Sequence, residues 1–530
     1  MAFTQEQEAG LLEVLAAFTN GKRINDLENA QGALKDMSIE VMDETGETHK
    51  MSLSDAVEQA ENPVAGRFWI DANATPTAAG YYGSLAALRA LPEKLGLGRY
   101  LVLDDRTKRK LDPTDSTRYA DGTPAALDGT QGQCMWCWNG FYANIFKEGG
   151  KTVKAITFNA PIGNGYSVFI PAGGISWFDA GVIDRTNNKL CSVINLDARY
   201  RGGAGSALNA ASYSHAPAAD SQQLTMLGMP ATQKSTTEFG TLARARGEGW
   251  EANWFVARFV VTFLFEVIMG TQDSQAAFSA TKDSDGLYQG GFGTGVTDMP
   301  DWGNYNGYYP CIPTSVGLEA GDGVCLVDYD MPDADGNNYH TFHVPVFFGL
   351  VTAGYGHLWR WVRGLTISQT AGEKTEVYVS PSMYAQFDPT SVSGMLKACE
   401  CPQQQNYIKR LSYNRLCCMP TEVGGSASTY YPDYFYTDAA SNSGLRVRAA
   451  GGNAINRSTA GAFNSNANNT ASNANTNYSS PLNIAKINAF MRQSLATWRK
   501  TTTAKRALVR PCALKAPNYA MQNEKKRLPI

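Results

Sequence analysis

Residues 449–482 form a 34-residue tract whose composition constrains the fold of this chain more than any other feature. In this tract 28 residues are Gly, Ala, Ser, Thr or Asn, and Lys, Glu, Gln, Met and Trp do not occur. On composition alone, so few apolar side chains are typical of a disordered, low-complexity linker. These five residue types are also those that an AAC codon cannot encode when both adenines are randomised and the last base is kept. This second property is typical of a diversified binding segment.

Aromatic segments upstream of the tract favour the diversified binding segment. Residues 424–436 read GGSASTYYPDYFY, and such a density of aromatic side chains requires a packed partner. Further upstream, residues 349–364 read GLVTAGYGHLWRWVRG, and residues 250–275 form an apolar, helix-like stretch. We therefore expect a folded scaffold directly before the tract.

Together with the tract, these segments resemble the variable proteins of diversity-generating retroelements over roughly residues 66–482. The resemblance implies an α+β chain with a C-type lectin-like fold, of the formylglycine-generating-enzyme subtype, whose long structured loops display hypervariable residues on a rigid face. Segments 111–115, 120–124 and 129–142 also resemble the lead-in of phage tail and fibre proteins of this type.

The resemblance implies a bacteriophage receptor-binding or fibre protein rather than an enzyme. It would be made in the host cytoplasm, enter the virion, contact other virion structural proteins through its N-terminus, act as a homotrimer and bind a bacterial cell-surface protein or glycan. Two alternatives remain open, an oxidase-like enzyme of the same fold and a bacterial surface adhesin.

The tract divides into residues expected to hold the loop and residues expected to face the ligand. Small and aromatic residues are expected to shape the backbone and anchor it, namely Gly451, Gly452, Ala460, Gly461 and Phe463. The expected ligand-facing residues are Asn453, Ile455, Asn456, Ser458, Thr459, Asn464, Ser465, Asn466, Asn468 and Asn469. The later asparagines at 473, 475 and 477 could instead hydrogen-bond the backbone of the loop itself.

The chain divides into four predicted regions. They are an N-terminal attachment or oligomerisation module at 1–65, a strand-rich lead-in at 66–201, a lectin-like domain at 202–482 with its variable region at 445–482, and a basic tail at 483–530. In the first region, helical spacing after Thr4 and alternation around Ile39 and Val41 predict a helix, hairpin, helix order. The tail carries eleven Lys or Arg residues and one acid, and relatives of this type usually end soon after the variable repeat.

Short apolar runs between turn residues predict the secondary structure of the body. Strands are expected at 100–103, 155–158, 166–170, 190–194, 376–379 and 445–447, and a core helix at about 250–270. Asp333 to Gly336 reads as a hairpin turn rather than a calcium loop.

Charge and cysteine usage narrow the function further. The net charge of −3 argues against a general nucleic-acid binder. The most apolar segment, 254–270, is too short for a bilayer span and contains Arg258 and Glu266, so no membrane insertion is expected. The ten cysteines, which include CxxC at 134–137, CxC at 399–401 and the pair 417–418, are expected to be structural thiols, and we expect no metal and no cofactor.

Overall fold

The computed structural model describes strands at 38–42 and 48–52, and then residues 62–178, 180–213, 215–276, 282–288, 290–291, 311–382 and 386–485. β1 (Ser38–Met42) and β2 (Thr48–Ser52) pair in antiparallel register, which confirms the predicted N-terminal hairpin. The two helices predicted beside this hairpin, and the basic tail from residue 486 onward, lie outside the described residues.

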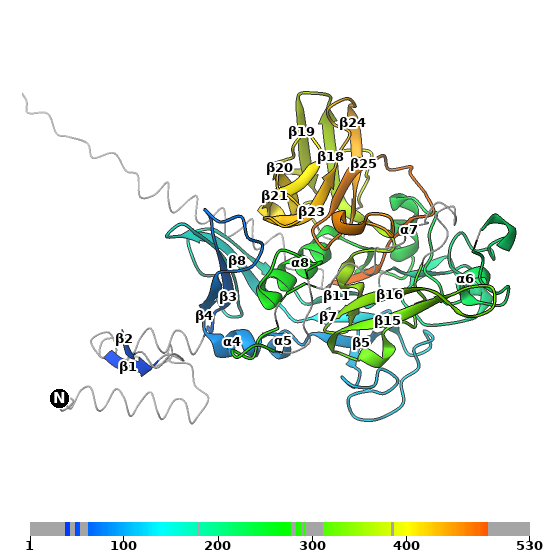
Figure 1. Ribbon diagram of the computed structural model, residues 1–530, viewed down its shortest axis with the longest axis horizontal. Coiled ribbons are helices and arrows are strands. Elements are labelled where there is room, and N and C mark those ends of the chain that lie inside the picture. Colours follow the sequence, from blue (N-terminus) through cyan, green and yellow to red (C-terminus); the bar gives the residue numbers. More distant parts are fainter. Residues whose placement is uncertain are drawn as a thin grey trace, which may run out of the picture.

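A five-stranded antiparallel sheet opens the body, in the order β10-β8-β9-β3-β4 (Figure 1). Its strands are β3 (Ala65–Ile70), β4 (Gly80–Gly83), β8 (Phe141–Glu148), β9 (Lys151–Thr157) and β10 (Tyr166–Ile170). Helices α4 (Leu85–Arg89) and α5 (Leu91–Lys94) follow β4 along the chain. β10 has the bounds that the sequence predicts, and β9 covers most of the predicted strand at 155–158.

A six-stranded sheet, in the order β14-β27-β11-β7-β5-β6, combines distant parts of the chain. Its strands are β5 (Gly98–Val102), β6 (Lys108–Lys110), β7 (Gln133–Trp138), β11 (Gly173–Ser176), β14 (Trp250–Ala252) and β27 (Leu482–Ala485). β27 lies between β11 and β14 and pairs with both. The regions predicted on either side of residue 201 therefore share one sheet, and the predicted tail begins inside a strand.

The largest sheet has nine strands and lies at the top of Figure 1. Eight of them follow the order β20-β19-β18-β24-β25-β23-β21-β22, and β26 pairs in parallel with β18. Their bounds are β18 (Trp359–Thr370), β19 (Lys374–Val379), β20 (Leu396–Glu400), β21 (Asn406–Ser412), β22 (Met419–Val423), β23 (Tyr431–Tyr436), β24 (Gly444–Ala450), β25 (Ser465–Asn469) and β26 (Tyr478–Ser479). The strands predicted at 376–379 and 445–447 are confirmed as parts of β19 and β24.

A long hairpin and several short elements complete the described body. β15 (Val324–Pro332) and β16 (Asn338–Phe347) pair around the predicted turn, where the Asp333 backbone N–H donates to the Asn337 carbonyl at 2.8 Å. β17 (Leu350–Val351) extends this pair, and β12 (Val182–Asp184) pairs with β13 (Lys189–Cys191). The remaining helical elements are α6 (Gln222–Thr225), α7 (Thr236–Arg244), η2 (Ala198–Tyr200), η3 (Ala210–Ser212), η6 (Leu318–Ala320), η7 (Thr352–Gly354), η8 (Asn414–Leu416) and η9 (Arg457–Thr459).

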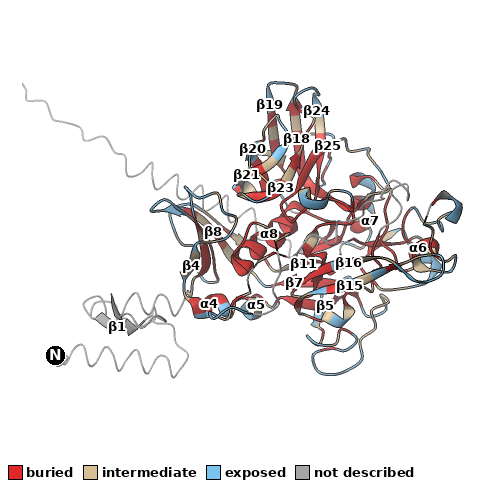
Figure 2. Cartoon of the chain, in the orientation of Figure 1, coloured by how far each residue is buried: buried red, intermediate tan, exposed pale blue. Residues whose placement is uncertain are grey.

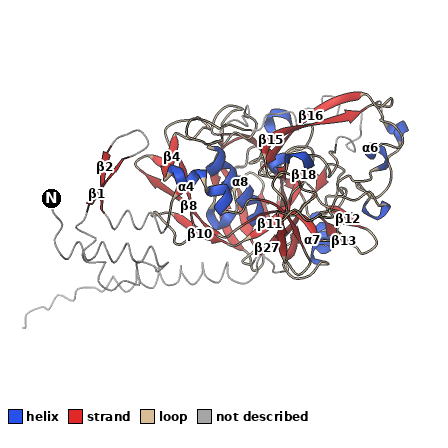
Figure 3. Ribbon diagram, turned by 90° about the horizontal axis from the view of Figure 1, so that it is seen from below, coloured by secondary structure: helices blue, strands red, loops and turns tan. Residues whose placement is uncertain are grey.

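Helix α8 (Phe255–Met269) is the centre of the core, and every one of its residues is buried (Figure 2). It contacts β3 and β9 of the first sheet, β11 of the second and β18 of the third, so it joins the three sheets (Figure 3). The predicted helix is confirmed, but it starts later than residue 250 because residues 250–252 form β14. It ends at Gly270, whose φ of 64° is in the left-handed region that glycine favours.

Among the described residues strands far outnumber helices, and α8 is the longest helix. None of the helices in the described ranges is long and apolar enough to cross a membrane.

Candidate functional site

The 449–482 tract folds as part of the nine-stranded sheet. It begins in β24, turns through η9, returns as β25 in antiparallel pairing with β24, continues through β26, and ends at the first residue of β27 in the six-stranded sheet. Ala460, Ala462 and Phe463 are buried, and the Phe463 ring packs on Tyr431 with centroids 5.0 Å apart. The linker interpretation is wrong, because the tract contributes strands and core side chains.

The five residues expected to anchor the loop are all buried. Asp433 holds one end of the loop, since its carboxylate accepts a hydrogen bond from the Phe463 backbone N–H at 2.6 Å. Gly461 lies directly against this carboxylate with a φ of 154°, and a Cβ there would collide with Asp433. Burial raises the pKa of Asp433 well above its ordinary value, which fits a carboxyl group enclosed by the loop.

Four of the residues expected to face a ligand are instead buried, so that expectation is wrong for Asn453, Asn464, Ser465 and Asn466. Asn464 donates its side-chain N–H to the Thr459 carbonyl, and Ser465 Oγ accepts from Arg448 Nε at 3.1 Å. Asn466 Oδ1 accepts from the Asn468 backbone N–H at 2.9 Å. The physical reason is that Asn and Ser side chains are short and form hydrogen bonds with nearby backbone groups. They can therefore be buried in a closely packed turn as readily as they lie on the surface.

The other six expected positions reach the surface to different degrees. Ile455 is 51% exposed. Ser458 and Asn468 are also exposed, while Asn456, Thr459 and Asn469 are half-buried. Ile455 and Ser458 lie on the turn that contains η9. We call residues 455–459 the η9 face.

Side-chain hydrogen bonds hold the η9 face in one conformation. Asn456 Oδ1 accepts from the Asn453 backbone N–H at 2.8 Å, and its Nδ2 donates to Tyr436 Oη at 3.1 Å. Thr459 Oγ1 donates to the Asn456 carbonyl at 2.6 Å and lies 2.8 Å from Tyr436 Oη. Asn456 and Thr459 thus use their polar atoms to tie the turn to β23, which leaves Ile455, Arg457 and Ser458 as the outward side chains.

A row of stacked aromatic side chains supports the η9 face from the core outward. In the core, Tyr478 stacks on Trp361 with centroids 4.3 Å apart and lies parallel to Trp359 at 6.3 Å. Both tryptophans are buried, so the 349–364 segment contributes aromatic side chains to the core.

The row continues to the surface through β23 and β21. Trp359 meets Tyr436 edge-on at 5.9 Å, Tyr436 lies 4.8 Å from Tyr434, and Tyr434 meets Tyr407 at 5.2 Å. The last three rings are half-buried, and Tyr436 lies beside the η9 face, because its Oη contacts Asn456 and Thr459. Residues 361, 478, 359, 436, 434 and 407 are called the aromatic row below.

The sequence did not indicate Tyr407, because it lies some fifty residues before η9 along the chain. Strand register brings it to the site, since Tyr407 pairs with Tyr434 across β21 and β23. The alternation of Tyr434 and Tyr436 within YPDYFY is the local signal for a surface-facing pair, but it does not indicate which strand lies beside them.

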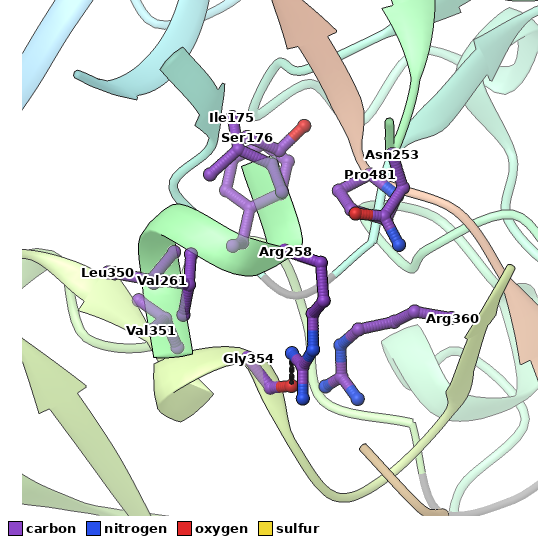
Figure 4. A pocket seen from close by; sticks show the side chains of 11 residues that line it. Ile175, Ser176, Asn253, Arg258, Val261, Leu350, Val351, Gly354, Arg360 and Pro481 are labelled. Carbon is purple, nitrogen blue, oxygen red and sulfur yellow. Dashed lines mark hydrogen bonds between the residues drawn. The ribbon is translucent and has the colours of Figure 1, made fainter. Parts of the chain in front are cut away.

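Beneath the loop the scaffold is closed and rich in arginine (Figure 4). Arg258 of α8 donates to the carbonyls of Gly354, at 2.5 Å, and Ala462, while Arg360 of β18 donates to the Leu358 and Gly356 carbonyls at 2.9 and 3.1 Å. Burial lowers the pKa of Arg258 to about 9. The cavity between these groups has a volume of about 20 Å³, which is room for little more than one water molecule. This cavity therefore has no room for a receptor side chain or a sugar.

Two cysteines that lie close together in space come from different pairs in the sequence. Cys399 Sγ lies 3.7 Å from Cys417 Sγ, across β20 and the turn after η8. Hydrogen bonding with Cys401, together with burial, raises the pKa of Cys399, and burial raises that of Cys417. Cys134 and Cys137 are buried in β7, where burial raises the pKa of Cys137 to about 12. Among the described residues, no three His, Cys, Asp or Glu side chains are arranged to hold a metal ion.

No protein-family model matches this chain, and no curated protein sequence does. Similar solved structures include the U1 and M1 variants of Major Tropism Determinant, each 12% identical, with 85% of this chain and 92% of that chain covered at a TM-score of 0.20. The I1 variant is 13% identical at the same coverage and TM-score. A TM-score of 0.20 is too low to establish a shared fold.

Proposed function

We propose that this chain is a bacteriophage receptor-binding or fibre protein that holds a bacterial cell-surface protein or glycan on the η9 face and the outer end of the aromatic row. The observation that carries the proposal is the difference in side-chain exposure within the tract. Ile455, Arg457 and Ser458 are exposed, while the residues on both sides of them are buried in the scaffold.

This arrangement suits a binding protein that presents its ligand-contacting side chains on a rigid loop. The turn is fixed before the ligand arrives, so association costs little ordering entropy, and the outward side chains can change without unfolding the body. Tyr436 adds half-buried aromatic surface beside the turn, and Tyr434 and Tyr407 extend this surface along β23 and β21. Tyrosine and arginine side chains are enriched among the residues that dominate binding energy at interfaces.

The finer features of the proposal rest on the sequence resemblance. They are a C-type lectin-like fold of the formylglycine-generating-enzyme subtype, a homotrimer in the virion, attachment to other virion proteins through the N-terminus, and diversification of the tract by a retroelement. The proposal includes no nucleic-acid partner, no membrane insertion, no cofactor and no catalytic activity. The raised pKa values of Cys399 and Cys417 fit this, because thiols that stay protonated are poor nucleophiles and poor metal ligands.

A binding experiment on bacterial cells tests the proposal. The fluorescently labelled full chain is incubated with a panel of bacterial strains, and strains that retain it are probed with a triple variant, Ile455→Asp, Arg457→Glu and Ser458→Asp. We expect this variant to lose cell binding and to keep the unfolding midpoint of the parent, because all three side chains point outward.

A matched control is a charge variant elsewhere on the tract, Ala474→Asp with Asn475→Asp, at two exposed positions away from η9. It should bind cells like the parent. Cell binding that survives the triple variant, or that both variants lose equally, would contradict the η9 face as the receptor site.

A further inference from the structure

A second concave surface, which residues 455–459 do not line, is formed by residues of the five-stranded and the nine-stranded sheets. These two sheets lie next to each other in Figure 1. It is a groove of about 680 Å³, within the range of about 300–1,000 Å³ typical of small-molecule sites. One wall comes from β3, β8 and β9, and the other from β21, β22 and the start of β23. The groove therefore lies on elements outside the 449–482 tract.

A buried polar cluster closes the floor of the groove. Lys154 of β9 forms an ion pair with Glu266 of α8, and its Nζ also donates to Tyr413 Oη at 2.9 Å and Tyr431 Oη at 2.8 Å. Gln272 Nε2 donates to Tyr431 Oη at 2.9 Å. Since the three donors of the Lys154 ammonium are all engaged, the floor is a fixed support, and recognition must come from the walls.

The walls carry more positive than negative charge. Lys147 stands on one wall, with its Nζ 2.6 Å from Asp71 Oδ2. Lys409 and Arg410 stand on the other wall and share one acid, Glu422, at 2.6 and 2.8 Å. These three basic groups thus have two acids between them, which leaves one positive charge in excess.

Lys147 and Arg410, from the two walls, line the same groove. Burial acts to raise the pKa of Asp71, but hydrogen bonds from Lys147 and Thr152 reverse this and lower it. The charge of Arg410, on the opposite wall, lowers the pKa of Asp71 further. Arg410 is 62% exposed, so its guanidinium can reorient towards a ligand at small cost.

Aromatic and amide side chains complete the lining. Tyr430 and Tyr166 line the groove with the indole of Trp69, and Asn73 and Asn164 are exposed at its rim. Aromatic faces pack against the C–H face of a sugar ring, and amides exchange hydrogen bonds with its hydroxyl groups. A simple inorganic anion would use neither of these features.

We propose that this groove binds an acidic saccharide, a sugar unit that carries a carboxylate or a phosphate. Lys147 and Arg410 would hold its negative group from opposite walls, Tyr430 would pack on the ring, and Asn73 or Asn164 would bond its hydroxyl groups. This proposal does not depend on the η9 face, and it gives the protein a binding site outside the 449–482 tract.

Isothermal titration of the full chain tests the groove with four probes, namely trigalacturonic acid, glucose 1-phosphate, maltotriose and inorganic phosphate. We expect the acidic sugars to bind more tightly than maltotriose and phosphate, with an affinity that falls as salt rises. Arg410→Gln and Lys147→Gln should each weaken binding by about tenfold, the value of one charged hydrogen bond. Binding of only one acidic sugar would identify carboxylate or phosphate as the preferred group.

The matched control is Lys397→Gln, which removes another exposed, ion-paired lysine on β20, outside the groove. It should bind like the parent, and all variants should keep the unfolding midpoint of the parent. Tyr430→Phe should also bind like the parent if the ring packs on the sugar.

Three results would overturn the proposal. They are no binding of either acidic sugar, equal binding of maltotriose or inorganic phosphate, and no difference between Arg410→Gln and Lys397→Gln. Because the triple variant of the η9 face leaves the groove intact, it should bind acidic sugars normally. Loss of cell binding and loss of sugar binding are therefore separate outcomes.

Discussion

Trp361 offers the sharpest test of the scaffold that carries the η9 face. Its indole is fully buried, stacks on Tyr478 at 4.3 Å, and donates from Nε1 to the Lys234 carbonyl at 3.0 Å. Trp361→Ala removes a large core side chain, which costs about 3–5 kcal/mol, and a stacked pair worth about 0.5–1.5 kcal/mol more. We expect a total loss of about 4–6 kcal/mol of unfolding free energy.

The assay is equilibrium denaturation in urea, followed by circular dichroism, with Trp361→Phe as the matched variant. Phenylalanine keeps a ring against Tyr478 and loses the hydrogen bond to Lys234, so it should cost clearly less than alanine. If Trp361→Ala stays within about 1 kcal/mol of the parent, the change expected of a surface site, then the aromatic row does not support the loop.

Four further predictions follow from individual contacts. Gly461→Ala should destabilise the fold by more than about 1 kcal/mol, because alanine is strained at positive φ and its Cβ meets Asp433. The control, Ser458→Ala, should change stability by less than about 0.5 kcal/mol, because Ser458 is exposed. Equal unfolding midpoints of the two variants would contradict the loop geometry. Asn456→Ala should speed amide hydrogen exchange at residues 453–460, because it removes the bonds to Asn453 and Tyr436; unchanged exchange would show that these bonds do not fix the turn. Folding raises the pKa of Asp433 above its ordinary 3.8, so this group stabilises the fold at low pH, and the stabilisation is lost as pH rises through the folded-state pKa. The unfolding midpoint of Asp433→Asn should therefore fall less with rising pH than that of the parent. Equal pH profiles of the midpoint would refute the raised pKa of Asp433. Native Cys417 should resist alkylation by iodoacetamide at pH 7, since burial raises its pKa, and rapid labelling seen by mass spectrometry would revive the oxidase-like alternative.

Local patterns predicted the elements whose signals are local. The short apolar run at 166–170 predicted β10 with its observed bounds, the longer apolar run predicted α8, and the Asp333 turn predicted the β15–β16 hairpin. In each case the residues that define the element lie within it, so hydrophobic periodicity and turn chemistry are sufficient.

Long-range pairing could not be predicted in the same way. β27 pairs with β11, more than three hundred residues earlier, and nothing in either short strand specifies the other. The burial of Asn464 and Asn466 was missed for a related reason, because a polar side chain reads as exposed until its backbone partner is known. Tyr407 reached the site only through strand register.

Site-specific photocrosslinking tests the central claim, that the η9 face touches the receptor, most directly. A benzophenone amino acid is placed at Ser458, and a second protein carries it at Leu196, which is 59% exposed and lies outside the tract. Both are irradiated on bacterial cells that bind the parent protein. The proposed function predicts a crosslink to an envelope component from position 458 and none from position 196. A crosslink from 196 alone, or none from 458 on cells that retain the protein, would contradict it.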